Sequence, residues 1–280
     1  MARVRVVTDS ACDLSAAVAE EQGITIVPLS IRFGSEEFVD GSVLSADEFW
    51  SRCAASPVLP ETSAPSPGVF QDAFLAAADD GYDSVVCINI SSELSGTNQS
   101  ARTAAEAVAD RIPVVTVDSR SATMGEGLIV LDLAELAASG ATPEELVARA
   151  DSIIPHTSVF GVVDTLEHLE KGGRIGGAKA MLGTLLSIKP VVTIANGIVE
   201  EESKQRTRSR SLKYLAGKAE AVGPVSRIAV CNGAATDIDE FVALLDGVKS
   251  EHPLVVADLG PVVGTHTGPG TIGLCMISAG

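Results

Sequence analysis

The chain has 280 residues, of which 46% are apolar, so it can bury the core of one large domain or of two ordinary ones. Its formal net charge of −17 repels nucleic acids and anionic lipid headgroups, so neither is expected as a partner. Only 4% of the residues are aromatic, and the core must therefore consist mainly of Ala, Val, Leu and Ile.

The cysteines and the apolar runs indicate the cellular compartment, and the histidines indicate whether a metal is bound. Its five cysteines are widely spaced and form no CxxC pair, which is typical of reduced thiols in the cytoplasm. No apolar run approaches the ~20 residues of a membrane-spanning helix, and no secretory signal precedes the first strand-like segment. The four histidines stand too far apart for metal-ligand spacing. We expect a cytoplasmic protein without a metal or a cofactor.

Short apolar runs alternate with helical patterns through the first half of the chain. Strands are predicted at 4–7, 24–33 with a break near Pro28, 84–90 and 114–117, and helices at 14–22, 46–54, 67–79, 98–109 and 127–138. This order predicts β-α-β units and a mainly parallel sheet that is covered on both faces. Ligands of such sheets bind beyond the carboxyl ends of the strands. Asp9 and Asp118 fall there, and such residues more commonly cap loops than act as acids or bases.

The second half has a different pattern. Strands are predicted at 158–163, 191–195, 198–203, 227–231 and 254–257, and helices at 166–171 and 238–248. Asn196-Gly197 between two strand-like runs is a strong hairpin signal. We therefore expect two domains, an N-terminal three-layer α/β domain at 1–155 and a smaller α+β domain at 156–280.

Two hydroxyl-rich turns precede predicted helices, Thr62-Ser63 and Ser95-Gly96-Thr97. Hydroxyl groups and free backbone N–H groups at a helix start form a site for a small anion. Two such turns together can bind one carboxylate or phosphate. Taken singly, each turn is better explained as an ordinary helix cap.

Basic residues supply further candidates for binding an anion. Arg174 follows two glycines and suits either an anion clamp or an ordinary surface position. His266 lies in a predicted flexible polar loop, where it would either steady an anion or face water. Basic residues also occur at every second position in one segment, at Lys204, Arg206, Arg208 and Arg210. If this segment is extended, their side chains share one face. That face would be a protected sheet edge, a docking patch or a phosphate-attracting rim.

Three nucleotide-binding or catalytic signatures are excluded. The G-x-G-x-x-G spacing at Gly268–Gly273 is followed by only seven residues, too few for a crossover helix and a ribose-binding acid. Gly217-Lys218 is followed by Ala219, so no Walker A motif is present. The chain also contains no G-x-S-x-G elbow.

Seven segments, in this order, resemble the DegV family of bacterial fatty-acid-binding proteins. They are Val7–Ser10, Thr62–Ser66, Ile90–Thr97, Val117–Ser119, Met124–Gly127, Leu169–Ile175 and Gly264–Gly270. The resemblance covers nearly the whole chain and implies a two-domain α/β protein that binds one long-chain fatty acid, such as palmitate or oleate, between its domains. It places the carboxylate at Thr62 and Ser95. The remaining implied site residues are Ser63, Gly96, Thr97, Arg174 and His266.

The resemblance also implies a partner and a role. Some family members are the fatty-acid-binding subunit of a two-component fatty acid kinase, in which a separate ATP-binding subunit phosphorylates the carboxylate for lipid synthesis. A monomer without catalytic residues is expected, and Glu93, close to the carboxylate site, should point away from it. Candidate tunnel walls are 124–129 and 181–186, and either segment is equally well read as ordinary core. The rival hypothesis is an acyl hydrolase or transferase that uses Ser95 with His266 as its base.

Overall fold

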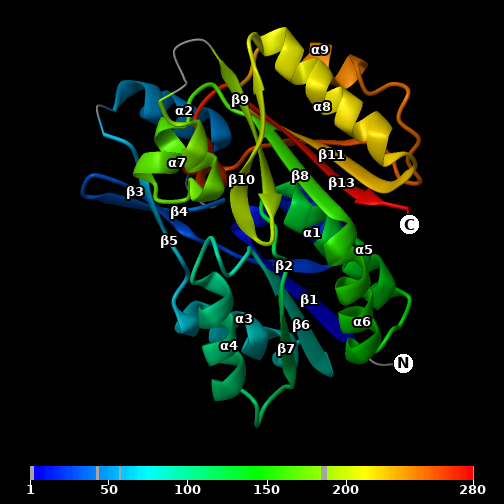
Figure 1. Cartoon of the computed structure of the whole chain (residues 1–280). Helices are drawn as coiled ribbons and strands as arrows, with labels where there is room; N and C mark the ends of the chain where they lie inside the picture. The colour runs from blue at the N-terminus through cyan, green and yellow to red at the C-terminus, as the bar shows by residue number, and fades with distance from the viewer. Residues whose placement is uncertain (1–2, 42–43, 57, 184–187, 280) are drawn as a thin grey trace.

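The N-terminal half forms three layers around a parallel sheet (Figure 1). The computed structural model describes residues 3–41, 44–56, 58–183 and 188–279. The sheet has the order β2 (Ile24–Val27), β1 (Val4–Asp9), β6 (Ser84–Asn89) and β7 (Val114–Asp118), and every neighbouring pair is parallel. This confirms the predicted three-layer α/β fold.

Helices cover both faces of this sheet because its strands are apolar on both faces. Every residue of β6 is buried. Val85 and Cys87 pack against α3 (Pro67–Asp79) and α4 (Thr97–Ala107), whereas Val86 and Ile88 face the opposite helices. That second layer contains α1 (Ala16–Glu21), α5 (Met124–Ala138) and α6 (Pro143–Ile153).

The C-terminal half contains a six-stranded mixed sheet. Its order is β10 (Ile198–Gln205), β9 (Lys189–Ala195), β8 (Thr157–Val162), β13 (Thr271–Ser278), β11 (Val225–Gly233) and β12 (Val255–Asp258). The β11–β12 pair is parallel and the other pairs are antiparallel. Asn196-Gly197 connects β9 to β10, so the predicted hairpin is confirmed. Strand β13 was not predicted from the sequence, although it is a central strand of this sheet.

Helix α5 lies between the two large sheets and is buried nearly all round. It packs against Val4 and Val6 of the parallel sheet and against Ala229 and Cys275 of the mixed sheet. A Cβ added at Gly125 would lie 2.3 Å from the side chain of Val159, so only glycine allows this approach. The opposite face of the mixed sheet packs against α8 (Arg208–Val222) and α9 (Ile238–Ala243).

A third, antiparallel sheet lies beside the two large ones. It has the order β4 (Glu36–Val39), β3 (Ser30–Phe33) and β5 (Glu61–Ser63). Near it lie the remaining helices α2 (Ala46–Ala55), α7 (Glu167–Lys171) and α10 (Pro261–Thr267) (Figure 1). Short 3-10 segments complete the described structure, η1 (Ser10–Cys12), η2 (Ile154–His156) and η3 (Gly176–Met181).

A shared basic face required an extended segment, and residues 204–210 are not extended throughout. Lys204 lies near the end of β10, but α8 begins at Arg208, so the alternation does not continue along an extended strand. The helix forms there because the side chain of Thr207 caps the backbone N–H of Arg210. Lys204 pairs with Glu201 and Arg208 with Asp237, so these charges are locally neutralised.

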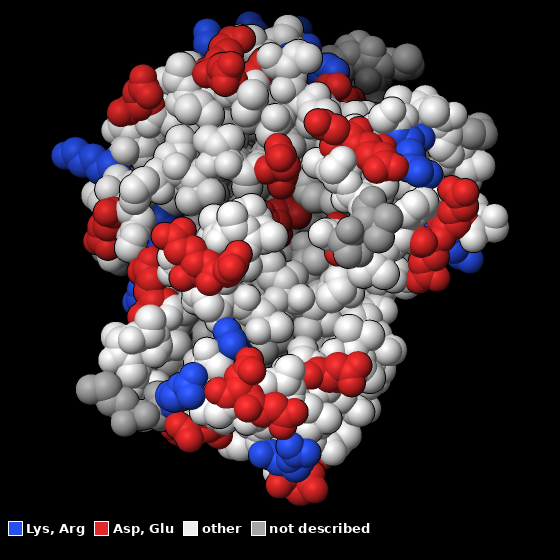
Figure 2. Space-filling model, turned by 180° about the vertical axis from the view of Figure 1, so that it is seen from behind, with Lys and Arg blue, Asp and Glu red and all other residues white. Residues whose placement is uncertain are grey.

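The chain has 37 acidic and 20 basic side chains, which gives the net charge of −17. Figure 2 shows red acidic side chains distributed over the rear face with fewer blue basic ones between them. No helix in the described part of the chain is long and apolar enough to cross a membrane.

Candidate ligand-binding pocket

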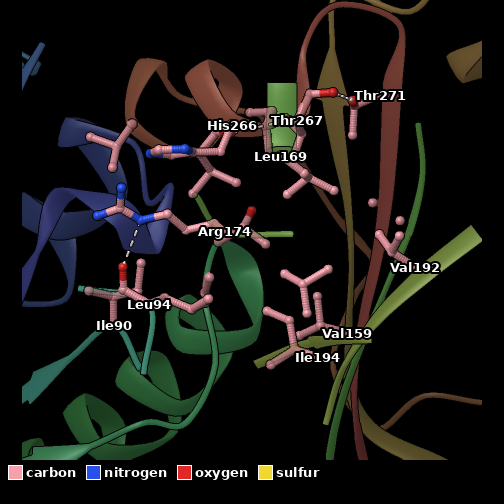
Figure 3. A pocket seen from close by; sticks show the side chains of 18 of the residues that line it. Ile90, Leu94, Val159, Leu169, Arg174, Val192, Ile194, His266, Thr267 and Thr271 are labelled. Carbon is pink, nitrogen blue, oxygen red and sulfur yellow. Dashed lines mark hydrogen bonds between the residues drawn. The ribbon is translucent and has the colours of Figure 1, made fainter. Parts of the chain in front are cut away.

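An apolar pocket lies between the N-terminal half and the mixed sheet. It contains about 880 Å³ of space that no atom fills, part of it open to solvent. Its walls are mainly aliphatic and come from both halves of the chain, including Leu29, Ile90, Val159, Val192, Ile194 and Val262. Figure 3 shows Arg174 and His266 on one side of the pocket and Val192 on the other.

Thr62 and His266 meet at the polar side of this pocket. Oγ1 of Thr62 lies 2.9 Å from Nε2 of His266, although 204 positions separate the two residues in the sequence. Thr62 lies in strand β5, paired opposite Ile31, and not in the predicted turn. His266 lies in helix α10, so the prediction of a flexible loop was also wrong. Pro261 stands at the start of this helix and Gly268, with φ 80°, ends it.

The imidazole of His266 is held in its neutral form. Burial, together with the electrostatic effect of Arg174 and His168, lowers the pKa of His266 to about 4. Nδ1 is buried and has no hydrogen-bond partner in the described structure. A Cβ at Gly172 would lie 2.2 Å from this nitrogen, so the ring is packed directly against the backbone of Gly172.

Ser95 also lines the pocket, in the loop that joins β6 to α4. Its Oγ lies 2.8 Å from Oγ1 of Thr97 and accepts a hydrogen bond from the Thr97 backbone N–H. Two carboxylates at the ends of parallel strands fix this loop: Asp9 accepts from the Ile90 N–H, and Asp118 accepts from the Ser92 N–H. The two aspartates therefore cap loops, as the more common interpretation of the sequence predicted.

Arg174 connects segments from the two halves of the chain. Its Nε donates to the carbonyl oxygen of Leu94 at 3.1 Å (Figure 3). Its Nη1 donates to the carbonyl oxygen of Gly172 at 2.7 Å. Among the described residues that line the pocket, Arg174 is the one that carries a charge, because His266 beside it is neutral. An anion bound at this side of the pocket would therefore meet one fixed positive charge.

Some predicted site residues lie outside this pocket lining. Ser63 is exposed and follows Thr62 in a strand, where neighbouring side chains point to opposite faces. Gly96 is an exposed helix cap, and Thr97 is buried behind Ser95. Glu93 is exposed, as expected, and does not line the pocket.

The two candidate tunnel segments do not form the described wall. Residues 124–129 belong to the core around α5, which is the alternative that the sequence left open. Residues 181–183 do not line the pocket either, and 184–186 lie outside the described residues. The aliphatic walls come instead from β8, β9 and α10. Residues 191–195 were predicted as a strand, but no feature of their sequence distinguishes a cavity wall from a packed core.

No group of three or more metal-binding side chains occurs within the described ranges. The polar side of the pocket offers hydroxyls, one imidazole and one guanidinium, which suit a small anionic group. The fold and the pocket thus define an α/β protein with an aliphatic cavity that is polar at one side.

The comparisons with known proteins agree with this description. The model of the DegV family, described as "Uncharacterised protein, DegV family", matches residues 3–279. A DegV domain-containing protein from Streptomyces coelicolor is 36% identical over 281 residues, which cover 98% of each chain. The chain therefore belongs to the DegV family.

Two solved structures share this fold and are described by their ligands. A DegV family protein from Thermus thermophilus, described as fatty-acid binding, has a TM-score of 0.90 and 33% identity, with 99% of each chain covered. A protein from Eubacterium ventriosum, described as binding stearic acid, has a TM-score of 0.85 and 29% identity, covering 99% of this chain and 98% of its own. These homologues bind fatty acids.

Proposed function

We propose that this protein binds one long-chain fatty acid, such as palmitate or oleate, with its carboxylate at Thr62 and Ser95. The observation that carries the proposal is a pocket with aliphatic walls in which Thr62, His266 and Arg174 lie close to one another. A fatty acid has the same division between a long apolar chain and a charged tip. The fatty-acid ligands of the homologues support the same choice.

The hydrocarbon supplies most of the binding free energy. Each methylene buried contributes about 0.8 kcal/mol, so ~14 methylenes contribute on the order of 11 kcal/mol before the cost of ordering the chain. The head-group contacts then orient the acid. With His266 neutral, protonation at Nε2 lets the ring donate to Thr62 Oγ1, which leaves the threonine hydroxyl proton for a carboxylate oxygen.

The proposed role is to present the acid to another protein. We propose a separate ATP-binding kinase subunit that phosphorylates the carboxylate in the cytoplasm, while this chain supplies the lipid and no catalytic residue. Arg174 would offset part of the charge that phosphorylation adds at this side of the pocket. The two hydroxyl-bearing segments come from 1–155 and much of the aliphatic wall from 156–280, which is the division into domains that we propose.

The rival hypothesis of catalysis by Ser95 has weaker support. A serine nucleophile needs a base within hydrogen-bond reach. Nε2 of His266 is paired with Thr62, and Ser95 is paired with Thr97. Incubation with acyl esters separates the two hypotheses, because the rival requires turnover that is lost in Ser95→Ala.

Matched variants at Thr62 test the proposed carboxylate site. Thr62→Val removes the hydroxyl and keeps the shape, and Thr62→Ser keeps the hydroxyl. A hydrogen bond to a charged group contributes about 1.5–3 kcal/mol, so Thr62→Val should weaken palmitate binding about 10- to 150-fold in a fluorescent-ligand displacement titration. Thr62→Ser should stay close to the parent protein. Equal palmitate affinities in Thr62→Val and the parent protein would contradict the proposed carboxylate contact.

A further inference from the structure

Two glycines face each other on the wall that the mixed sheet contributes to the pocket. Gly161 of β8 is paired in register with Gly273 of β13, and both line the pocket. Val192 of β9 is the partner of Gly161 on its other side. At Gly161 and Gly273, therefore, two adjacent strands present backbone without side chains to the pocket.

The strand alternation shows which face these glycines occupy. Side chains two residues apart in a strand share a face. Val159, two residues before Gly161, and Cys275, two residues after Gly273, both pack in the core that contains α5. Phe160 and Leu274, the intervening neighbours, pack against α8 on the opposite face. A side chain at either glycine would therefore project towards the N-terminal half and the pocket.

The space beyond Gly161 is empty. A Cβ built there meets only one atom within 4 Å, a methyl carbon of Val192 at 3.5 Å, which is an ordinary van der Waals contact. A Cβ at Gly273 would lie 3.1 Å from Cβ of Cys231, which is a tight contact. Gly161 is thus the position where a methyl group enters the pocket without disturbing the sheet.

This bare backbone lies away from the polar side of the pocket. Figure 3 shows Val192, the strand neighbour of Gly161, across the pocket from Arg174 and His266. A chain whose carboxylate lies beside Arg174 reaches the glycine pair with its distal methylenes.

The wall beside Gly273 is fixed by hydrogen bonds. Cys231, the strand partner of Gly273, lies 3.1 Å from Oγ1 of Thr123, and the same oxygen lies 2.5 Å from Oδ2 of Asp13. Oδ1 of Asp13 accepts a hydrogen bond from the Gly260 N–H. This network connects the two halves of the chain, so the wall cannot easily move to make room for a longer ligand.

We propose that Gly161 and Gly273 set the longest acyl chain that this protein accepts. This inference rests on the proposed function and names two residues that determine its specificity. The distal methylenes lie directly on the β8–β13 backbone, in space that a side chain at either position would fill. A methyl group at Gly161 excludes chain atoms from this end and leaves the carboxylate contacts unchanged.

Affinities for a series of saturated fatty acids, from decanoate to eicosanoate, test this proposal. The affinity of the parent protein should rise with chain length and then level off. Each excluded methylene weakens binding about fourfold, which corresponds to about 0.8 kcal/mol. Gly161→Ala should bind the shortest acids as the parent does, bind the longest at least fourfold more weakly, and level off earlier. Gly161→Val should level off earlier still.

The control is Gly217→Ala on the exposed face of α8, where an added Cβ has nothing within 4 Å. It should reproduce the parent's profile, and the melting temperature of each variant verifies its fold. An unchanged profile in Gly161→Ala, or an equal loss at every chain length, overturns this inference while the proposed function stands. If the parent protein binds none of the acids, the proposed function itself fails.

Discussion

At the scale of single residues, the orientation of His266 depends on the absence of a side chain at Gly172. The residue has φ −74°, so alanine fits its backbone conformation, and only the space is lacking. A Cβ there would lie 2.2 Å from Nδ1 of His266 and 2.9 Å from the carbonyl oxygen of His168. The ring must therefore move, and its hydrogen bond with Thr62 must lengthen or break.

We predict that Gly172→Ala weakens fatty-acid binding about tenfold or more, equivalent to about 1.4 kcal/mol. The same displacement titration measures it, with Gly217→Ala as the matched glycine-to-alanine control. If Gly172→Ala binds palmitate as tightly as Gly217→Ala does, the position of the imidazole does not matter for the carboxylate site.

At the scale of elements, the β9–β10 hairpin forms one wall of the pocket and is attached to the N-terminal half at its tip. Oγ of Ser91 donates to the carbonyl oxygen of Gly197 at 2.7 Å, and the guanidinium of Arg120 donates to that of Asn196. Gly197 has φ 83°, and a Cβ there would lie 2.6 Å from Ser91 Oγ, so the contact also requires this glycine.

Ser91→Ala should loosen the tip of this hairpin. Loss of a donor to a buried carbonyl costs about 1–3 kcal/mol, and amide hydrogen exchange across 191–205 should become faster. The control is Ser152→Ala, whose exposed hydroxyl bonds only within α6, to the carbonyl oxygen of Arg149. Similar exchange rates for 191–205 in both variants would show that the Ser91 contact does not restrain the hairpin.

Elements with strong local signals were predictable from the sequence, and those that depend on distant partners were not. Pro67 and Asn196-Gly197 fixed a helix start and a hairpin at the predicted places. Thr62 lies in a three-residue strand that exists only because β3 pairs with it. Helix α10 contains four residues from a Gly- and Thr-rich segment, which local propensity assigns to a loop.

At the scale of the whole molecule, several buried carboxyl groups make stability depend on pH. Burial raises the pKa of Asp40 to about 6, against a partial lowering by hydrogen bonds from Ser10 and Gly41. Burial similarly raises the pKa of Asp9 to about 6 and that of Glu126 well above its ordinary value. The folded protein therefore binds more protons than the unfolded chain between about pH 4 and 6. The protonated carboxyl groups stabilise the fold fully below about pH 4, and this stabilisation is lost as the pH rises through 6.

His266 contributes in the opposite sense, because its folded pKa of about 4 lies below its ordinary value. Comparing the parent protein with Asp40→Asn removes this contribution, because His266 is present in both. Relative to Asp40→Asn, the unfolding free energy of the parent protein should fall by up to about 3 kcal/mol between pH 4 and 7. Urea denaturation at several pH values measures it. Parallel profiles would mean that Asp40 titrates with an ordinary pKa.

The pocket shows how far the sequence determines the site as a whole. The seven segments that resemble the DegV family identified Thr62, Ser95, Arg174 and His266, and the structure brings these four residues to one pocket. The aliphatic walls were not identified, because an apolar residue beside a cavity and one in a packed core have the same sequence pattern. Leu29 and Val159 come from different halves of the chain and both line the pocket, so its walls depend on how the two halves pack.

The central claim is that the pocket between the N-terminal half and the mixed sheet binds a long-chain fatty acid. Lipid extraction of the purified protein, followed by mass spectrometry, tests it most directly. The account predicts close to one fatty acid per chain, with clearly lower occupancy in Thr62→Val. An extract without fatty acid, from protein that also fails to bind added palmitate or oleate, would contradict it.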